Sequence, residues 1–544
     1  MQYQKTIYFF SLIFIFSTIN IYFFTDDFIN IFTLLHETLG YNYGIVYAVA
    51  VLFSLGALSL LFFIEKRSIF IILLIYICIA YIISFIYNDI NGTSFSYQDL
   101  RIAMDEAGKL GFHAALTFQN SILYAFGIVF LILIPLAYIR KNIVKRKLYL
   151  KNKIIFPIAI LSILGTFFII SKTAYGTNQF PAPIKLIDTF LYSAVNSIYY
   201  GPRNKLTIVP THREEYKNIV WIIDESIGGK YLSQNGYIKE TTPYLDTLSN
   251  NMINLGLASS GSNLSSSSNL ILMSGIQLAN LPDKETNALK KSNIFQYAQN
   301  AGYYTSYISG QSHEDKLQNF MTNYDTEFIN HFYQPTNEEH NILNKVPEKY
   351  IIDHVKSVLD KNEKNFIFIV KAGAHFDYEN DYPQNKKVFF PTLSKNQSMK
   401  GEKKKSVNSY LNAIRWTVND FFKHFFEKTD ILKRKDTLII YTSDHGQSIL
   451  ENNIVATHGT VSNAPKSQGI VPLILFTDNK SKLEKKINTS INSASHFMIF
   501  PTTINLMGYD TNHTTLLQDN HTKQIFISGG LFGLSNMYLN DINK

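Results

Sequence analysis

Two adjacent side chains with metal-binding chemistry, those of Asp444 and His445, follow a short apolar segment of this chain. That segment, residues 437–441, is Thr-Leu-Ile-Ile-Tyr and predicts a buried β-strand, so both side chains stand where a strand ends. A carboxylate oxygen and an imidazole nitrogen are ligands that suit Zn²⁺ and similar divalent cations. An Asp-His pair by itself is more often structural, but a further histidine, His458, follows in the next loop. The pair is therefore a candidate metal site that needs partners from elsewhere in the chain.

Two other segments offer such partners. Glu225 follows a second predicted strand at residues 218–223, although the acidic residues there can also cap a helix. The serine-rich segment 259–268 leads directly into an apolar helical pattern, where a hydroxyl meets the positive end of the helix dipole. A flexible loop is the simpler interpretation of so many serines. Held beside a metal ion, however, a serine loses its proton more easily and can attack phosphorus.

The elements that must position these groups alternate between short apolar strands and helical patterns. The predicted strands are residues 218–223, 303–308, 365–370, 437–441, 471–476 and 524–527, and helices are predicted at 347–360 and 407–427. This order predicts an α/β domain with a mostly parallel sheet flanked by helices, which binds ligands at the carboxyl ends of its strands. Residues 395–407, rich in Lys, Ser and Asn, predict a solvated loop.

The first third of the chain has a different composition. Five apolar runs without internal charge occupy residues 6–24, 44–64, 69–87, 122–139 and 154–170. Each is close to the ~20 residues that a helix needs to cross a bilayer. A buried core helix explains one such run but not five, and the first run lacks the cleavage site of a signal peptide. Residues 1–172 are therefore predicted to be an α-helical membrane domain of five transmembrane helices.

Lysine and arginine predict the orientation of this domain. The loop 140–153 holds seven basic residues and no acid, and the basic residues of 65–67 lie on the same side. The amino terminus is then cytoplasmic, and the chain after residue 170 is exported. The formal net charge of +8 comes largely from the basic residues of these cytoplasmic loops, so we do not expect nucleic-acid binding. The single cysteine, Cys78, lies in the third run, which leaves the exported part without disulfides or cysteine ligands.

Residues 173–215 are expected to join the membrane domain to the exported domain. Two prolines at 181–183 break the chain, and apolar residues at helical spacing over 184–200 predict an amphipathic bridging helix. Residues 216–544 are then the exported domain, which is long enough to bury a core of its own.

Several of these motifs together resemble phosphoethanolamine transferases, sulfatase-like members of the alkaline phosphatase superfamily. Segment 265–275 is similar to the sulfatase signature, with Ser265 at the nucleophile position. Segment 443–448, Ser-Asp-His-Gly-Gln-Ser, resembles the family's Ser-Asp-His-Gly-Glu-Ser, and Thr-His-Gly at 457–459 follows at the family's spacing. Segments 223–243 and 373–383 resemble two further family motifs. Five membrane spans before an exported sulfatase-like domain is also this family's layout.

The resemblance implies roles for individual residues. Glu225, Ser265, Asp444 and His445 would bind a catalytic Zn²⁺, with Mn²⁺ or another divalent metal as the alternative. His375 and His458 would bind the donor phosphate or a second zinc and act in catalysis. Further substrate-binding residues are expected at Asp105, Glu106, Ser312 and His313. The chain departs from the family in its serine nucleophile, one of four in a row where threonine is usual, and in its lack of disulfides.

The function implied is transfer of phosphoethanolamine from phosphatidylethanolamine, through a phospho-Ser265 intermediate, to a hydroxyl of lipopolysaccharide, lipid A or another surface glycan. We expect a monomeric protein of the bacterial inner membrane with a periplasmic catalytic domain. One alternative is a phosphoglycerol transferase similar to lipoteichoic acid synthase, which uses phosphatidylglycerol. A second, of another class, is a non-catalytic membrane-bound glycan-binding module. A plain sulfatase is disfavoured because Ser265 lacks the x-Pro-x-Arg sequence that follows the sulfatase nucleophile.

Overall fold

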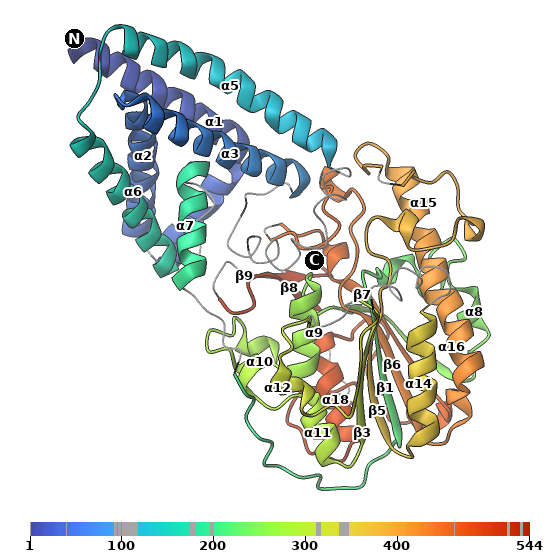
Figure 1. Ribbon diagram of the computed structural model, residues 1–544. Helices are drawn as coiled ribbons and strands as arrows, with labels where there is room; N and C mark the ends of the chain where they lie inside the picture. The colour runs from blue at the N-terminus through green and yellow to red at the C-terminus, as the bar shows by residue number, and fades with distance from the viewer. Residues whose placement is uncertain are drawn as a thin grey trace. The chain divides into compact units, whose positions relative to one another are not determined.

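The chain divides into a helical unit and an α/β unit (Figure 1). The computed structural model describes residues 2–39, 41–91, 95, 100, 118–173, 180–195, 201–311, 317–336, 348–395, 397–461, 463–518, 523–533 and 537–544. The helical unit comprises Met1–Ser197 with Gly533–Asn536, and the α/β unit comprises Ile198–Phe532 with Met537–Lys544.

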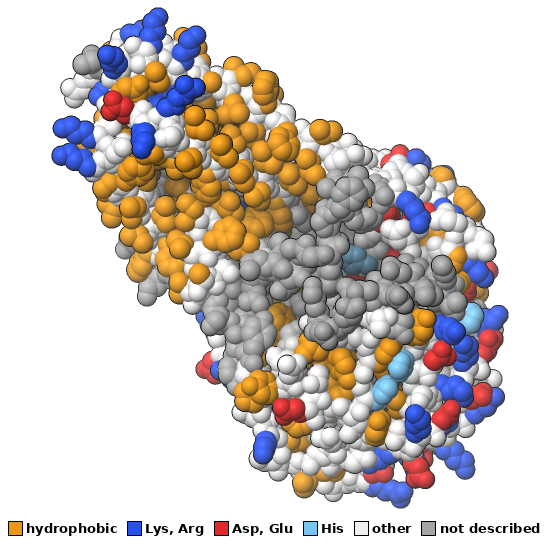
Figure 2. Space-filling view, in the orientation of Figure 1, with side chains coloured by type: hydrophobic (Ala, Val, Ile, Leu, Met, Phe, Trp, Pro, Cys, Tyr) orange, Lys and Arg blue, Asp and Glu red, His pale blue; other side chains and the backbone are white. Residues whose placement is uncertain are grey.

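Five long helices make up most of the helical unit: α1 (Gln2–Leu39), α2 (Tyr41–Leu60), α3 (Arg67–Asn91), α5 (Gln119–Lys145) and α6 (Asn152–Thr173). Each contains a stretch long and apolar enough to cross a membrane, as the sequence predicts. Large apolar side chains cover much of this unit's surface in Figure 2. Phe14 is 72% exposed and Leu123 is 70% exposed. Such a surface is suited to lipid and not to water.

Three contacts bring the basic segments to one end of the helical unit. Lys5 donates to the carbonyl of Tyr149 at 3.0 Å, and Arg140 donates to the carbonyl of Phe62 at 2.6 Å. The backbone N–H of Leu150 donates to a carbonyl in the 61–63 segment at 3.1 Å. Lys and Arg side chains gather at one end of this unit in Figure 2. The amino terminus and both basic loops thus share a side, which fits the predicted orientation.

A shorter helix, α7 (Ala182–Val195), packs against α3 and α6 in the same unit. Its buried face carries polar residues, including Asp188, which is fully buried. Its exposed face is apolar, with Phe190 53% exposed and Val195 70% exposed. The sequence predicts an amphipathic helix here. The apolar face points outward, the reverse of a helix on a soluble protein. Residues 196–200 of the predicted helix lie outside the described residues.

The α/β unit is built on a seven-stranded sheet of order β2-β7-β6-β1-β5-β3-β4. Its strands are β1 (Asn218–Asp224), β2 (Met252–Ser259), β3 (Tyr304–Ser309), β4 (His331–Tyr333), β5 (Asn365–Val370), β6 (Thr437–Ser443) and β7 (Ile470–Thr477). The pairings from β6 through β1, β5 and β3 to β4 are all parallel, and β7 pairs antiparallel with β6 and β2. The predicted mostly parallel sheet is therefore confirmed.

Two strands of this sheet were not predicted from the sequence, and one predicted strand belongs to a second, smaller sheet. In β2 the register shifts between Asn254 and Leu257, around Gly256, so its side chains do not alternate regularly. Strand β4 has only three residues. The strand predicted at 524–527 corresponds to β8 (Ile525–Gly529), which pairs with β9 (Met537–Asp541) in a separate two-stranded sheet.

Helices cover both faces of the main sheet. In Figure 1, α14 (Lys349–Lys361) and α16 (Phe421–Thr429) lie on one face, and α9 (Ser265–Ser274), α11 (Ile294–Asn300) and α18 (Ile499–Leu506) lie on the other. The core joins them to the sheet: Phe422 of α16 packs on Tyr441 of β6, and Trp221 of β1 donates to Thr503 of α18. Shorter helices are α8 (Pro243–Asp246), α10 (Asn287–Lys290), α12 (Asn323–Thr326) and α17 (Lys480–Glu484).

The predicted helix at 407–427 is confirmed but begins earlier. Helix α15 (Lys403–Ile414) continues through a π-helical segment, η8 (Arg415–Asp420), into α16. The solvated loop predicted at 395–407 is wrong from Lys403 onward. Lysine and serine at the exposed first turns of a helix resemble a loop in composition, and Ser406 is in fact buried.

Candidate active site

The ends of two neighbouring parallel strands place the candidate ligands side by side. Asp224, the last residue of β1, pairs in register with Ser443, the last residue of β6. Glu225 and Asp444 are the next residues along each strand, and the N–H of Asp444 donates to the carbonyl of Asp224 at 2.9 Å. The two acids therefore meet because two parallel strands end at the same level.

Glu225 is further held by the turn that follows β5. The N–H of Ala374 donates to the carbonyl of Glu225 at 3.0 Å. Gly373 adopts a φ of +63°, and a Cβ atom there would lie 2.2 Å from that carbonyl oxygen. Only glycine permits this close approach, so the turn and the metal-site strand pack as one unit.

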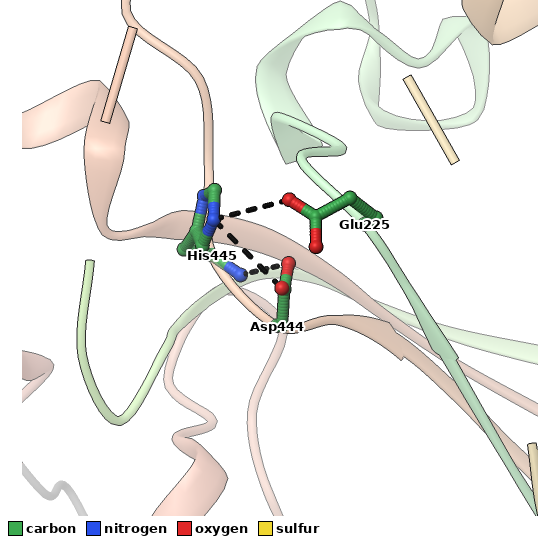
Figure 3. Close-up of side chains that lie close together, drawn as sticks. All are labelled: Glu225, Asp444 and His445. Carbon is green, nitrogen blue, oxygen red and sulfur yellow. Dashed lines mark hydrogen bonds and ion pairs between the residues drawn. The ribbon is translucent and has the colours of Figure 1, made fainter. Parts of the chain in front are cut away.

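Glu225, Asp444 and His445 bring three potential ligand atoms within 4.8 Å of one another (Figure 3). His445 Nε2 lies 3.3 Å from Glu225 Oε1 and 3.7 Å from Asp444 Oδ2. All three side chains are buried. Two carboxylates and one imidazole converging on a common point are a donor set that Zn²⁺ and similar cations accept.

The hydrogen bonds around Asp444 leave one of its carboxylate oxygens free. Asp444 Oδ1 accepts from the N–H groups of His445 at 2.7 Å and Ser226 at 3.1 Å. Its other oxygen, Oδ2, is buried and has no hydrogen-bond partner among the described residues. His445 Nδ1 lies 2.9 Å from the carbonyl of Gly446, to which it donates, and this leaves the lone pair of Nε2 facing the carboxylates. The chain thus fits a divalent cation at this position.

The charges of the three side chains are strongly interdependent. Burial would raise the pKa of Glu225, but the hydrogen bond and charge of His445 hold this pKa well below its ordinary value. Burial and the charge of Glu225 raise the pKa of Asp444 well above its usual range. Burial would lower the pKa of His445, yet the charges of Asp444 and Glu225 raise it to about 9. Without a metal ion, His445 is protonated, and its positive charge balances the carboxylates.

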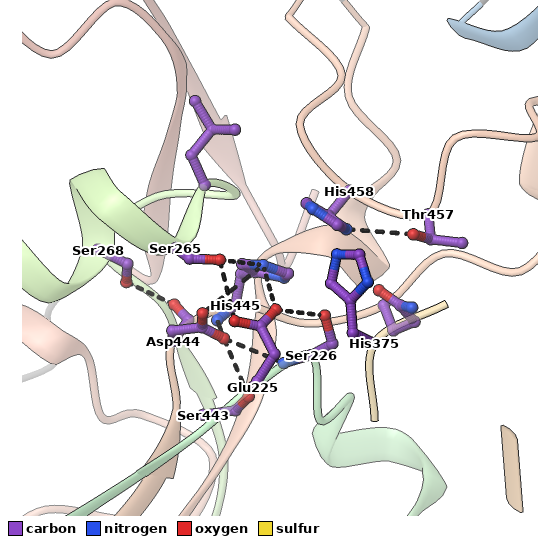
Figure 4. A network of polar contacts seen from close by, with 12 residues as sticks. Glu225, Ser226, Ser265, Ser268, His375, Ser443, Asp444, His445, Thr457 and His458 are labelled. Carbon is purple, nitrogen blue, oxygen red and sulfur yellow. Dashed lines mark hydrogen bonds and ion pairs between the residues drawn. The ribbon is translucent and has the colours of Figure 1, made fainter. Parts of the chain in front are cut away.

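Ser265 stands at the first position of α9, beside these ligands (Figure 4). Its hydroxyl donates to Glu225 Oε2 at 3.1 Å and lies 3.2 Å from His445 Nε2. The neighbouring serines are engaged differently: Ser268 donates to the carbonyl of Asp444, and Ser262 accepts from the N–H of Leu264 at 3.3 Å. Of these three serines, Ser265 is the one whose hydroxyl contacts both Glu225 and His445.

The structure also brings His375 and His458 to the site. The ring of His458 stacks on that of His445 with 4.3 Å between centroids, and the ring of His375 lies 5.3 Å from that of His458. Burial and the charges of His445 and His375 lower the pKa of His458 well below its ordinary value, so this ring is neutral. His375 is exposed, and its Nδ1 donates to the carbonyl of Phe376, 2.8 Å away. The two rings thus continue the site outward from His445.

The sulfatase family model matches residues 217–509, more than half of the chain. The chain belongs to the sulfatase family. Its similar relatives include the Kdo(2)-lipid A phosphoethanolamine 7''-transferase of Salmonella typhimurium, 24% identical over 60% of this chain and 58% of the relative. The phosphoethanolamine transferase EptA of Helicobacter pylori is 27% identical over 58% of this chain and 57% of the relative. The chain thus matches little more than half the length of these relatives.

Solved structures share the architecture of this sulfatase. The lipooligosaccharide phosphoethanolamine transferase A of Neisseria meningitidis matches 91% of this chain and 95% of its own, with a TM-score of 0.59 and 17% identity. The periplasmic domain of Escherichia coli EptC, in complex with Zn, matches 63% of this chain and 97% of its own, with a TM-score of 0.52 and 18% identity. These likenesses confirm the fold, a helical membrane unit joined to a sulfatase-like α/β domain.

The sulfatase site includes polar groups that the sequence motifs do not reveal. Gln311, which follows β3, donates to Glu225 Oε2 at 2.8 Å. Ser226 donates to Glu225 Oε1 at 2.7 Å and adopts a left-handed φ of +62°. Two signals pointed to Gln311: it follows a predicted strand, and it directly precedes the predicted substrate-binding residues Ser312 and His313. The predicted residues Asp105, Glu106, Ser312 and His313 lie outside the described residues.

A buried lysine lies behind the candidate metal ligands. Lys371 Nζ donates to Asp224 Oδ2 at 2.6 Å and lies 3.4 Å from Glu348 Oε2. Asp224 Oδ1 in turn accepts from the N–H of Glu225 at 3.1 Å. Lys371 also donates to the carbonyl of Thr417, which lies in the π-helical segment. A π-helical turn frees carbonyls from the regular helix pattern, which supplies this acceptor.

Proposed function

We propose that this member of the sulfatase family transfers phosphoethanolamine from phosphatidylethanolamine to a hydroxyl of lipopolysaccharide, lipid A or another surface glycan. The relatives named above are phosphoethanolamine transferases, which supports the group transferred. The observation that carries the proposal is the position of Ser265, whose hydroxyl lies within hydrogen-bond distance of both Glu225 and His445. A helix N-terminus beside a cation site suits a serine that attacks phosphorus.

Zn²⁺ is the proposed cofactor, with Mn²⁺ or another divalent metal as the alternative. Glu225, Asp444, His445 and the hydroxyl of Ser265 would hold it, since their polar atoms already converge. When bound, the ion supplies positive charge that favours the deprotonated serine and balances the negative charge on the phosphoryl group.

The proposed reaction has two displacements at phosphorus. In the first, Ser265 Oγ forms a bond to phosphorus as the bond to the diacylglycerol oxygen breaks, which leaves phosphoethanolamine on Ser265. In the second, the acceptor hydroxyl attacks the same phosphorus, and Ser265 is the leaving group. His375 or His458 serves as acid or base, since the two rings lie beside the serine and its ligands.

The substrate contacts are proposed by resemblance for Asp105, Glu106, Ser312 and His313. The protein is proposed to act as a monomer in the bacterial inner membrane, with residues 216–544 in the periplasm. The lipid donor would then reach the site from the outer leaflet of that membrane. The five candidate spans support this placement because they hold the domain at a bilayer surface.

The decisive experiment is mass spectrometry of the purified full-length protein incubated with phosphatidylethanolamine. Wild-type protein should carry a phosphoethanolamine adduct on Ser265, and Ser265→Ala should lose both adduct and transfer. Ser266→Ala is the matched control, because it removes the adjacent hydroxyl and should keep both. An adduct on Ser262 or Ser266 would contradict the assignment of the nucleophile.

The donor is tested against the alternative of phosphoglycerol transfer. Phosphatidylethanolamine and phosphatidylglycerol, each labelled in the head group, are supplied separately in vesicles. Only the true donor leaves its label on the protein and on the acceptor glycan. Label from phosphatidylglycerol alone would overturn the proposed donor. Label from neither, together with no bound metal, would favour the non-catalytic glycan-binding alternative.

A further inference from the structure

One buried histidine, His496, contacts three segments of the chain that carry the candidate active site. It lies in a short 3-10 turn, η12 (His496–Met498), directly before α18, and is 1% exposed. Its Nδ1 lies 3.1 Å from the N–H nitrogen of Gly261 and 3.2 Å from Ser268 Oγ. Its Nε2 lies 3.0 Å from Thr442 Oγ1.

The partners of the ring determine which nitrogen carries the proton. Gly261 offers a backbone N–H, which can only donate, so Nδ1 accepts and has no proton. Nε2 therefore carries the proton and donates to Thr442. Burial lowers the pKa of His496 to about 3, so the ring is neutral in this tautomer. A neutral ring with a fixed tautomer acts as a rigid link between one donor and one acceptor.

These three partners lie close in sequence to the reactive groups. Gly261 lies four residues before Ser265, and Ser268 lies three residues after it. Thr442 lies two residues before Asp444, and Ser268 also donates to the carbonyl of Asp444. One imidazole thus joins the two ends of the nucleophile segment to the strand that carries the candidate metal ligands.

The packing around this link leaves little freedom for the nucleophile segment. A Cβ atom on Gly261 would lie 2.9 Å from the side chain of Ile271 in α9. Ser259 and Ser260, which precede it, are held by the carbonyls of Ala494 at 3.1 Å and Gly469 at 2.9 Å. His496 connects this segment with β6 through a single side chain.

We propose that His496 is a positioning residue that sets the distance between Ser265 and the Asp444–His445 pair. This inference rests on the proposed role of Ser265 as nucleophile. His496 contacts neither Ser265 nor the candidate ligands through its ring, and it acts through Gly261, Ser268 and Thr442. An in-line attack tolerates a displacement of only about 0.5 Å, and a displacement near 1 Å can cost about 100-fold in rate.

Two variants test the hydrogen bonds of Nδ1 and Nε2 separately. In His496→Asn the amide oxygen occupies the place of Nδ1 and can accept from Gly261, but the bond to Thr442 is lost. In His496→Gln the longer amide reaches Thr442 and leaves the N–H of Gly261 without its acceptor. Both variants remove the ring and leave a polar group in the core, so their melting temperatures should fall together.

The first readout is formation of the Ser265 adduct by full-length protein in a single turnover. His496→Asn should keep the rate within about 3-fold of wild type, because Thr442 stays fixed in β6 by its pairing with β1 and β7. His496→Gln should lose about 100-fold, because it frees Gly261 in the segment that carries Ser265. The loss should appear in kcat and not in KM, because the donor site is unchanged. Equal losses in both variants, in proportion to their melting temperatures, would show a purely structural role and overturn the proposal.

The second readout does not depend on transfer. Full-length protein loaded with Co²⁺ reports the ligand geometry through its visible absorption spectrum. His496→Gln should shift this spectrum, because Ser265 moves relative to Asp444 and His445, and His496→Asn should leave it near that of wild type. A spectrum unchanged in both variants would overturn the positioning role. If wild-type protein forms no adduct, the proposed function fails, and the cobalt spectra still decide the role of His496.

If the histidine variants do not fold, Ser268→Ala and Thr442→Val provide the same test. Each removes one hydroxyl that contacts the ring and leaves the ring in place. Ser268→Ala should lower kcat and shift the cobalt spectrum more than Thr442→Val does. The reverse order would contradict a link that acts through the nucleophile segment.

Discussion

The helical unit and the α/β unit treat buried charge in opposite ways. In the α/β unit, the buried Lys371 contacts Asp224 and Glu348, and the network continues to the backbone of Glu225. In the helical unit, Asp188 is fully buried, and neither carboxylate oxygen has a hydrogen-bond partner among the described residues. Burial raises the pKa of Asp188 from 3.8 to about 7, so this group is about half protonated near pH 7.

The surfaces of the two units differ in the same sense. The helical unit exposes apolar side chains such as Phe14 and Leu123, whereas Lys, Arg, Asp and Glu are distributed over the α/β unit in Figure 2. A unit in lipid can leave its apolar residues outside, while a unit in water must bury them and pair every charge that it buries. We expect the polar groups of the α/β unit to perform the chemistry. We expect the helical unit to place that chemistry at a membrane.

The largest expected effect follows from neutralising a buried acid of the site. Asp444→Asn keeps the acceptor for the N–H groups of His445 and Ser226 but removes the negative charge opposite the cation. We expect loss of bound metal and a fall of at least about 1,000-fold in adduct formation, since both depend on that charge. Metal content and single-turnover rates of the purified protein measure this.

The matched control is the same substitution in the other unit. Asp188→Asn also neutralises a fully buried acid, and it should keep wild-type metal content. Equal loss of metal in both variants would contradict the separation of chemistry from placement.

The next effect concerns the membrane unit as a whole. A protein that begins at Tyr216 retains Glu225, Ser265, Asp444 and His445, so it should bind metal and slowly cleave a small soluble phosphodiester. Transfer from phosphatidylethanolamine in vesicles should fall about 100-fold or more, because the spans no longer hold the site at the bilayer. Rates of the cut and full-length proteins on both substrates test this. Equal rates on the vesicle substrate would refute a positioning role for the helical unit.

A smaller and graded effect is expected from pH on metal affinity. His445 has a pKa of about 9 in the metal-free site, and a cation must displace its proton. Below pH 9 the affinity should therefore rise with pH, by about tenfold per unit for each proton displaced, and level off above it. Chelator competition at pH 6, 7 and 8 measures the slope. An affinity independent of pH would contradict the protonated state of His445.

The smallest effect concerns stability in the helical unit. Because the folded pKa of Asp188 lies above 3.8, its contribution to stability is present at low pH and is lost as pH rises toward about 7. Asp188→Asn removes this dependence, so the variant should gain most over wild type above pH 7. Melting temperatures of the full-length protein in detergent at pH 5 and pH 8 should show a larger gap at pH 8. An equal gap would indicate that Asp188 is already paired.

The sequence by itself determined the elements whose local pattern is strong. Five long apolar runs predict five spans, because crossing lipid requires a continuous apolar helix whatever surrounds it. Apolar strands followed by Glu225 and by Asp444-His445 predict a site at the strand ends, because parallel strands of one sheet end at one edge. Ser265 was identified through a family signature and through its place before an apolar helix. These inferences need only neighbours along the chain.

The tertiary structure decided which distant residues complete the site. Lys371, Gln311 and His496 lie in unremarkable local sequence, and the partners of these three residues given above, Asp224, Glu225 and Gly261, are 147, 86 and 235 residues away along the chain. Their roles arise only when β5, β3 and the turn before α18 pack against the ends of β1 and β6. Burial then makes each unpaired polar atom costly, so the fold selects the side chain that satisfies it. The need for a hydrogen-bond partner arises from packing, so no local sequence pattern predicts it.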